Sequence, residues 1–350
     1  MGTGKRDAKV NGVLIVDKPQ GVTSHDIVAA VRAALHTRKV GHAGTLDPMA
    51  TGALVIGVGH ATRLLQYIVE HTKTYSATIR FGQRTTTDDA DGEFVEREAE
   101  AAVLPTLEQV REAVANEYTG DIEQIPNAVS AIKVNGQRAY DLAREGRHVE
   151  LKARRVTVHA FDVLGGRQTQ AATGTPVLDV DVRVPGSAGP YIRALARDLG
   201  NDFHCGAHLT RLRREAVGAF RVRDARIVRA HAEARTFVNR DGEEITRNRA
   251  VLDCVGEDLA GHLLTMVQAA QLTLPVLAVS EAQAADLRFG RRIVAQAPTD
   301  DERPAHHHGE HVWAAIGSAD GEPEVVAIVE RAKHHEFKPV TVFAANTGNE

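Results

Sequence analysis

The sequence predicts an α+β fold in which a mixed, largely antiparallel sheet is flanked by helices. Segments with strand-like patterns outnumber helical ones, and they do not follow the regular strand–helix alternation of a parallel sheet. The pattern changes after about residue 222, and a second group of short strand-like segments begins near residue 272. We therefore expect one large domain over residues 11–271 and a small β-rich domain over residues 272–345.

The first third of the chain alternates between apolar runs and polar, glycine-containing segments. Short apolar runs indicate buried strands, and an alternation of apolar and polar side chains indicates a half-buried strand. Thr23 or Ser24 can cap a helix whose apolar residues recur with helical spacing up to Leu35. The remaining elements are strands at 12–16, 54–56 and 75–81, and loops at 38–48 and 85–92.

The same periodicities predict the elements of the rest of the chain. The predicted helices cover residues 106–118, 138–144, 191–199 and 224–274. The predicted strands cover residues 128–134, 156–161, 177–184, 209–220, 274–279, 312–316, 325–329 and 340–343. Residues 1–10 and 297–311 are polar enough to predict a disordered tail and a disordered loop.

The composition is that of a globular protein in a reducing compartment. The chain has 350 residues, of which 43% are hydrophobic and 25% are charged. Cys205 and Cys254 form no C-x-x-C pair, so neither a disulfide framework nor a thiolate metal site is indicated. The polar N-terminus does not resemble a signal peptide, and no run of 18 apolar residues predicts a membrane span. We expect a cytoplasmic protein.

Positive charge is concentrated in two segments, although the formal net charge is −4. Residues 191–229 contain nine Arg and four acidic residues, and residues 133–155 contain seven Lys or Arg and three acidic residues. Such asymmetry is typical of a nucleic-acid-binding face on an acidic body. Ordinary solvated helix and strand surfaces would also explain it.

Asp47 and Pro48 lie in a polar segment with several glycines, between two apolar elements. Because Asp is a favoured helix cap and Pro a favoured first helical residue, the pair alone could simply begin a helix. His42, Gly44 and Thr45 lie nearby in the sequence. A flexible loop of this kind can also bring a carboxylate close to a ligand.

The segment GHAGTLDPMATG, with NGVLIVDKPQGVTSHDIV before it, resembles the catalytic core of the TruB family of stand-alone tRNA pseudouridine-55 synthases. The similarity covers roughly residues 11–220. It continues through KTY at 73–75, FGQRT at 81–85, DADG at 89–92, QIP at 124–126, SAIK at 130–133, YIR at 191–193, GAH at 206–208 and LRR at 212–214.

This resemblance implies a reaction and its central residues. The N1–C1′ bond of uridine is broken, the base turns, and a C5–C1′ bond forms, without a metal or another cofactor. Asp47 matches the family nucleophile, Tyr75 the tyrosine that stacks on the target base, and Arg193 the arginine that pairs with the aspartate. Tyr75 could otherwise be a packed strand tyrosine, and Arg193 a surface arginine. The order of bond breaking stays open.

The resemblance also implies substrate contacts. Tyr191 and Leu212 match residues that line the uracil pocket, and His42 matches a histidine at the space that the flipped base leaves. Lys18 matches a lysine beside the catalytic loop, as structural support or a phosphate contact. The segment 121–155 corresponds to an insertion that clasps the RNA stem-loop. The expected RNA-backbone contacts are Lys133, Arg154, Arg155, Arg211, Arg213 and Arg214.

The partner that the resemblance implies is tRNA, bound at its T stem-loop by a monomer without a guide RNA. By position, the C-terminal domain resembles a PUA-like RNA-binding barrel. One departure is Pro190, which removes a backbone donor directly before Tyr191 where relatives carry Gly-Thr. An RNA chaperone with secondary modification activity is an alternative, and a guide-dependent synthase subunit is a third. The histidines at 306–308 and 311 could bind metal adventitiously.

Overall fold

The computed structural model describes residues 10–95, 103–127, 151–239, 241–296, 312–319, 321–333 and 335–344, with strand positions at 133–134 and 137–138. Two compact units result. The first comprises Met1–Leu46, Gly52–Thr72 and Ala216–Glu350, and the second comprises Asp47–Thr51 and Lys73–Glu215. The predicted disorder at 1–9 and 297–311 lies outside the described residues.

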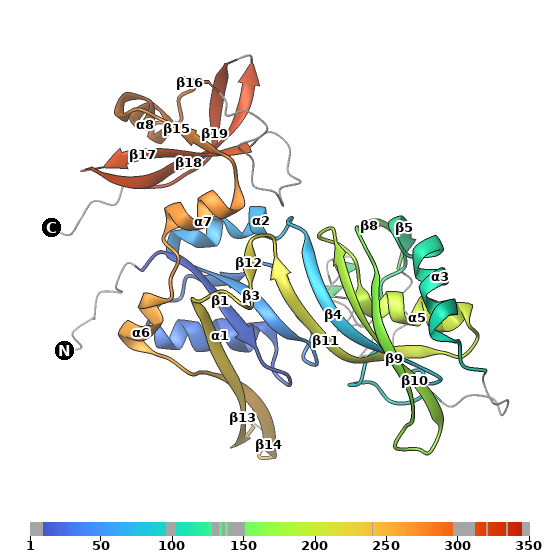
Figure 1. Ribbon diagram of the computed structural model, residues 1–350. Coiled ribbons are helices and arrows are strands. Elements are labelled where there is room, and N and C mark those ends of the chain that lie inside the picture. Colours follow the sequence, from blue (N-terminus) through green and yellow to red (C-terminus); the bar gives the residue numbers. More distant parts are fainter. Residues whose placement is uncertain are drawn as a thin grey trace. The chain divides into compact units, whose positions relative to one another are not determined.

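The first unit contains the strand order β14-β13-β1-β3, with β2 paired to β3 (Figure 1). β1 is antiparallel to β3 and parallel to β13, and it is almost completely buried, as its apolar sequence predicts. The strands are β1 (Gly12–Lys18), β2 (Val40–His42), β3 (Thr51–Val58), β12 (Phe220–Arg221), β13 (Ile227–Val238) and β14 (Glu244–Leu252).

Helix α1 (Ser24–Ala34) follows β1 directly. Its N-cap is Thr23, whose side chain accepts a hydrogen bond from the Asp26 amide while the Asp26 carboxylate accepts one from the Thr23 amide. The predicted cap at this position is confirmed. The other helices of this unit are η1 (Gly59–Arg63), α2 (Leu65–Ile68), α6 (Gly256–Gly261), α7 (Met266–Thr273) and α8 (Glu281–Arg288).

The prediction of helix over 224–274 is wrong for most of that range, because β13 and β14 form a long antiparallel hairpin there. Their register runs without interruption from Ala230 opposite Leu252 to Val238 opposite Glu244. Ala, Glu and Arg favour helices. The alternation of side chains in β13 nevertheless has the period of a strand, and pairing with β14 stabilises the strand conformation. Only α6 and α7 are helical in the predicted range.

A curled five-stranded sheet at the C-terminal end confirms the predicted β-rich region. Its order is β15-β17-β18-β19-β16, and Trp313 packs edge-on against Phe337 in its core. The strands are β15 (Val276–Ala278), β16 (Ile293–Val294), β17 (Val312–Ala319), β18 (Glu322–Lys333) and β19 (Glu336–Val342). One buried cluster joins Val325 and Ile328 of this sheet to Val13 and Ile15 of β1, so both regions share a core within the first unit.

The second unit contains the strand order β11-β4-β10-β8-β5, with β9 paired to β10. Antiparallel pairing between β4 and β10 extends from Lys73 opposite Gly186 to Phe81 opposite Leu178. The elements are β4 (Lys73–Phe81), α3 (Leu107–Glu117), β5 (Gly120–Gln124), β6 (Lys133–Val134), β7 (Gln137–Arg138), β8 (Arg154–Val158), β9 (Asp162–Gln170), β10 (Pro176–Gly186), α5 (Ile192–Asp202) and β11 (Ala207–Val217).

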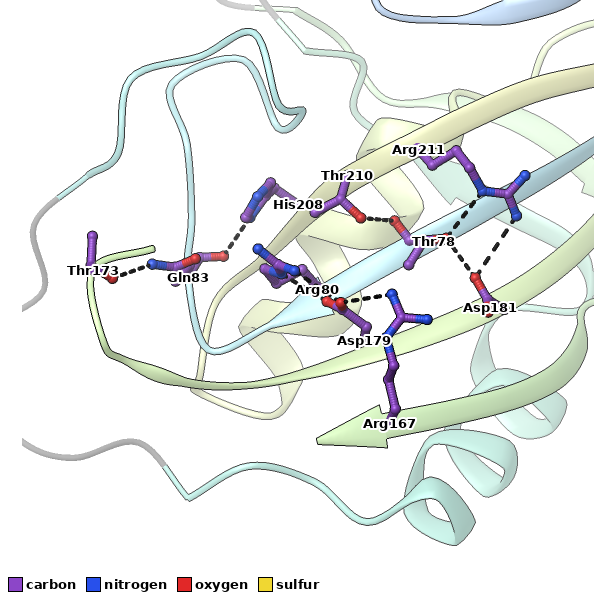
Figure 2. Close-up of polar contacts among 10 residues, drawn as sticks. All are labelled: Thr78, Arg80, Gln83, Arg167, Thr173, Asp179, Asp181, His208, Thr210 and Arg211. Atoms are coloured by element: carbon purple, nitrogen blue, oxygen red, sulfur yellow. Dashed lines mark hydrogen bonds and ion pairs between the residues drawn. The ribbon is translucent and has the colours of Figure 1, made fainter. Parts of the chain in front are cut away.

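The two faces of this second sheet differ in polarity. One face meets α5, because Phe81 of β4 packs edge-on against Phe203 at the end of that helix. The other face, here called the polar face, carries an ion-pair network (Figure 2). On it, Arg80 forms a two-pronged contact with Asp179 at 2.7 and 2.9 Å, and Thr78 donates to Asp181 at 2.5 Å. Side chains two residues apart on β4 lie on one face, so Tyr75 lies on the face opposite to Thr78.

The α+β class and the largely antiparallel sheet are therefore confirmed. Most of the predicted insertion, residues 128–150, lies outside the described residues except for the strand positions of β6 and β7. The predicted strand at 128–134 and helix at 138–144 fall largely in that range. Within the described residues, no helix is long and apolar enough to cross a membrane.

Candidate active site

Asp47 begins a tight turn, not a helix. The Ala50 amide donates to the Asp47 carbonyl at 3.0 Å, and Pro48 occupies the second position of the turn, where its fixed φ is favourable. No helix follows Pro48, so the helix-cap explanation of this pair is wrong. The side chain of Asp47 stays 36% exposed, which leaves its carboxylate open to a ligand.

Arg193 binds this carboxylate from the first turn of α5. Its Nε lies 3.0 Å from Oδ2 of Asp47 and 3.5 Å from Oδ2 of Asp89, and its Nη1 donates to the Thr87 carbonyl at 3.0 Å. The Arg193 side chain is only 5% exposed. A buried guanidinium between two carboxylates holds both of them in a fixed direction. The predicted pairing of Asp47 with Arg193 is present.

Asp89 is the central residue that sequence reasoning did not single out. It lies in the loop after β4 and is 3% exposed. Thr87 donates its hydroxyl to Oδ1 of Asp89 at 2.5 Å, and the Asp91 amide donates to the same oxygen at 3.1 Å. These contacts turn Oδ2 of Asp89 toward Arg193. Its signal was the DADG motif at 89–92, which marked the resemblance but carried no local hint of a partner on a distant helix.

A second arginine repeats this arrangement one helical turn later. Arg197 lies 3.6 Å from Oδ2 of Asp88, and its Nη2 donates to the Ile125 carbonyl at 2.7 Å. Asn127 donates to the same Asp88 oxygen at 2.5 Å. Burial raises the pKa of Asp88, while Asn127 and Arg197 oppose that rise. Asp88 has a φ of 59°, a conformation that short polar residues tolerate better than others. Arg193 and Arg197 thus bind adjacent loop residues.

Tyr191 lies within electrostatic range of the Asp47 carboxylate and of Tyr75. Burial raises the pKa of Tyr191, and the charge of Asp47 raises it further, whereas Arg154 and Arg193 lower it. Arg154 of β8 therefore lies within electrostatic range of Tyr191. Leu212 of β11 is 6% exposed. Of the residues predicted in this unit, Asp47 and Arg193 are in direct contact, and Tyr191 lies within electrostatic range of both.

Gln124 supplies the backbone partners next to Pro190. Its Oε1 accepts from the Tyr191 amide at 2.7 Å, and its Nε2 donates to the Tyr191 carbonyl at 3.0 Å. The backbone amide and the backbone carbonyl of Tyr191 are therefore both hydrogen-bonded to one side chain at the end of β5. Pro190 itself packs against Gly186, where a Cβ would meet the proline ring at 2.9 Å. The missing donor of Pro190 does not disturb Tyr191.

Two buried cations lie on β4 and β11. Lys73 is 4% exposed, and it shares a face of β4 with Tyr75, two residues further on. Burial lowers the pKa of Lys73 to about 7, and the nearby charge of Arg214 lowers it as well. Arg214 is 0% exposed. Its prediction as an RNA-backbone contact is wrong, since no part of this side chain reaches the surface. Arg214 is two residues from Leu212 in strand β11, so both side chains point to the buried face of the sheet.

The other predicted RNA-backbone contacts lie in several places. Arg211 contacts Thr78 at 3.3 Å and Asp181 at 3.8 Å on the polar face, as Figure 2 shows. Arg213 lies 3.8 Å from Glu215, which accepts from Ser76 of the same face. Both arginines therefore lie on the face opposite to Tyr75. Arg155 is exposed and pairs with Asp121 at 2.9 Å. The side chain of Lys133 lies outside the described residues.

Lys18 and His42 belong to the first unit. Lys18 is completely buried, and its Nζ donates to the carbonyls of Val22 at 2.6 Å and Pro19 at 2.9 Å. These contacts close the turn between β1 and α1, which favours structural support over a phosphate contact. His42 ends β2 opposite Ile56 and is half-buried. Leu46, directly before Asp47, is held at both its amide and its carbonyl by the Ser24 hydroxyl of α1.

Potential metal ligands do not gather in the described parts of the chain, where no three His, Cys, Asp or Glu side chains could hold an ion together. The histidines at 306–308 and 311 lie outside those parts. Cys205 is buried and Cys254 is half-buried, and both are reduced.

Solved structures with similar folds include two RNA–protein assemblies. An H/ACA RNP bound to a substrate RNA containing 2′-deoxyuridine matches with a TM-score of 0.61 at 22% identity, over 96% of this chain and 86% of that one. An archaeal box H/ACA sRNP Nop10–Cbf5 complex matches with a TM-score of 0.60 at 22% identity, over 98% and 90%. At 22% identity, this similarity shows that the fold is shared and nothing about the activity.

Sequence relatives are much closer. The TruB family pseudouridylate synthase N-terminal domain matches residues 32–192. The chain is 49% identical to tRNA pseudouridine synthase B of Bifidobacterium longum subsp. infantis, over 95% of this chain and 98% of the relative. It is 44% identical to the protein of the same name from Thermobifida fusca, over 96% and 99%. The chain therefore belongs to the TruB family.

Proposed function

We propose that this chain isomerises uridine-55 in the T loop of tRNA to pseudouridine, acting as a single chain without a guide RNA and with Asp47 as the nucleophile. The relatives named tRNA pseudouridine synthase B support the reaction and the substrate class. The observation that carries the assignment of the site is the contact between Asp47 and the buried Arg193 at 3.0 Å.

Asp47 meets the physical requirements of a nucleophile in this reaction. Its carboxylate is partly exposed, while the cation that orients it is buried and held from behind by Asp89 and the Thr87 carbonyl. The attacking group is thus positioned before substrate arrives, which lowers the cost of reaching the transition state. A uridine stacked in RNA hides its reacting atoms, so the base must leave the stack to reach Asp47.

The neighbouring side chains fit the turning of a detached base. The N1–C1′ bond breaks, the C5–C1′ bond forms, the proton at C5 leaves and N1 gains a proton. Tyr191 lies within electrostatic range of Asp47 and of Tyr75, and aromatic rings such as these two can stack on a flat base. Burial keeps the Tyr191 hydroxyl protonated at neutral pH, so it can donate to a base oxygen.

The test is release of tritium from an unmodified tRNA transcript labelled at uridine C5. We expect release with the wild-type chain, no release with Asp47→Asn, and no release when uridine-55 is replaced by cytidine. Asp181→Asn is the matched control, because Asp181 is similarly exposed, at 43%, but lies on the polar face. Undiminished release by Asp47→Asn would reject Asp47 as the nucleophile, and a need for added RNA would reject guide independence.

A further inference from the structure

The two strands of the hairpin, β13 and β14, carry all of their arginines on one face. Because side chains alternate along each strand and the register has no shift, two distinct faces can be assigned. The arginine face consists of Arg229, His231, Glu233, Arg235 and Phe237 of β13 with Ile245, Arg247, Arg249 and Val251 of β14. The opposite face carries alanines and small polar residues: Ala230, Ala232, Ala234, Thr236, Thr246, Asn248 and Ala250.

Charges on the arginine face are only partly balanced. Arg249, directly opposite Glu233, donates from its Nε and Nη2 to Oε2 of that glutamate at 3.1 and 2.6 Å. His231 pairs with Asp253 at 2.8 Å. Arg235 lies directly opposite Arg247, both are exposed, and neither has a carboxylate within ion-pairing distance in the described part of the chain. Like charges facing each other across two strands lower the stability of a hairpin. A ligand with closely spaced negative charges would remove that repulsion.

Position matters more than total charge here. The segment 227–253 has as many acidic residues as arginines, but three of the acids, Asp241, Glu243 and Glu244, lie in or beside the turn. The middle of the arginine face holds Glu233 alone, already bound by Arg249. Phe237, 42% exposed on the same face, adds an aromatic surface beside the two arginines. Arginine with an interleaved aromatic is typical of an RNA-binding surface.

The hairpin extends from the end of the sheet at which β1 ends and β3 begins. Asp17 of β1 pairs with Arg229, and the next residue, Lys18, pairs with Gly52 of β3. β13 therefore continues past the end of β1, and Figure 1 shows the two strands projecting beyond α1. The base of the hairpin rests on the turn before α1, where Asn248 donates to the Gly21 carbonyl at 3.2 Å. The same helix binds Leu46, directly before Asp47.

We propose that the arginine face of this hairpin is a second RNA-binding surface, which contacts the phosphate backbone of the tRNA whose uridine reaches Asp47. This rests on the proposed function. Arg235 and Arg247 supply the phosphate contacts, Arg229 extends them toward β1, and the contacts do not depend on nucleotide sequence.

The test compares two single variants at adjacent residues, each of which changes the net charge of the hairpin by −1. Arg247→Gln acts on the arginine face, and Thr246→Glu acts on the opposite face of the same strand. Binding to tRNA is measured in the Asp47→Asn background by fluorescence anisotropy from 50 to 300 mM salt. For Arg247→Gln we expect roughly tenfold weaker binding at low salt and a log–log salt slope shallower by about one. Thr246→Glu should leave both near the wild-type values.

Thermal unfolding without RNA provides an independent test, because the melting temperature and the affinity for tRNA should change in opposite directions. Arg247→Gln should raise the melting temperature slightly, because the repulsion with Arg235 is gone, while it weakens binding. If Arg247 only stabilised the fold, Arg247→Gln would lower both the melting temperature and the affinity for tRNA. Equal binding and salt slopes in the Asp47→Asn parent and in the same parent with Arg247→Gln would overturn the proposal, as would equal losses from both variants. If the Asp47→Asn parent bound no tRNA, the proposed function itself would fail, which is a separate result.

Discussion

Arg193 and Arg247 carry the same charge in contrasting surroundings. Arg193 is 5% exposed and lies between two carboxylates and a carbonyl, each within 3.5 Å. Arg247 is exposed and faces Arg235. A buried cation without partners would cost several kcal/mol, whereas an exposed one costs little because water solvates it. Burial thus requires the complete set of partners around Arg193, and exposure permits the unbalanced pair.

The difference separates two tasks of positive charge in one protein. Around Asp47, charges are matched internally, so geometry is fixed before any ligand binds. On the hairpin, charges remain available to a polyanion, so they contribute affinity and salt dependence but little precision. Variants should therefore affect turnover in the first region and binding in the second.

The largest expected effect is at Arg193. Lysine cannot reach Asp47, Asp89 and the Thr87 carbonyl in the planar directions of a guanidinium, so Arg193→Lys should lower kcat by roughly a hundredfold with little change in tRNA affinity. Single-turnover tritium release and anisotropy measure the two quantities. Arg197→Lys is the matched control one turn later, and its kcat should fall less. Equal losses from the two variants would contradict the special place of Arg193.

A second expectation concerns Lys73, a buried cation next to another cation. Its pKa is about 7 in the folded chain and about 10.5 when unfolded, so unfolding takes up a proton between these values. The free energy of unfolding should therefore rise from pH 7 to pH 10, by an amount on the order of a few kcal/mol. In Lys73→Met this rise should disappear. Denaturant unfolding at pH 6.5, 8 and 9.5 measures it; parallel curves for both proteins would disprove the assignment.

The smallest effect is expected at Arg249, the hairpin arginine that has a partner. Its contact with Glu233 is half-exposed, so Arg249→Gln should lower the melting temperature at pH 7 by about 1 °C or less. Arg249 lowers the pKa of Glu233, hence this contribution is present at neutral pH and is lost as acid protonates the glutamate. Scanning calorimetry at pH 7 and pH 3 should show the difference only at pH 7. A larger loss at pH 3 would be inconsistent with the ion pair.

The sequence predicted the sheet class and the Asp47–Arg193 pair, but it failed where local preference and pairing disagree. In β13 the residues RAHAEART are good helix formers, yet their period of two is that of a strand. The decision depends on β14, which pairs across a turn in which the side chain of Asn239 accepts from the amides of Asp241 and Glu243. A prediction from the pattern of β13 alone does not include the pairing with β14, and that pairing determines the conformation.

Asp89 was missed for a related reason. Its role is defined by Arg193, more than a hundred residues later, and nothing in the DADG motif points to that helix. Arg214 is buried although it lies in an arginine-rich segment, because charge alone does not indicate which face of a strand a residue occupies. The alternation in β11 already placed it with Leu212, so the sequence held enough information to predict its burial.

The spacing of Arg193 and Arg197 constrains how the length of this protein can vary. Two adjacent loop residues, Asp88 and Asp89, are matched to two arginines one helical turn apart. Inserting one residue between those arginines would rotate the second by about 100° around the helix and separate it from Asp88. The hairpin has no such match at its far end, so it can lengthen or shorten by residue pairs. Length differences among relatives are therefore expected at the hairpin turn and not within 88–89 or 193–197.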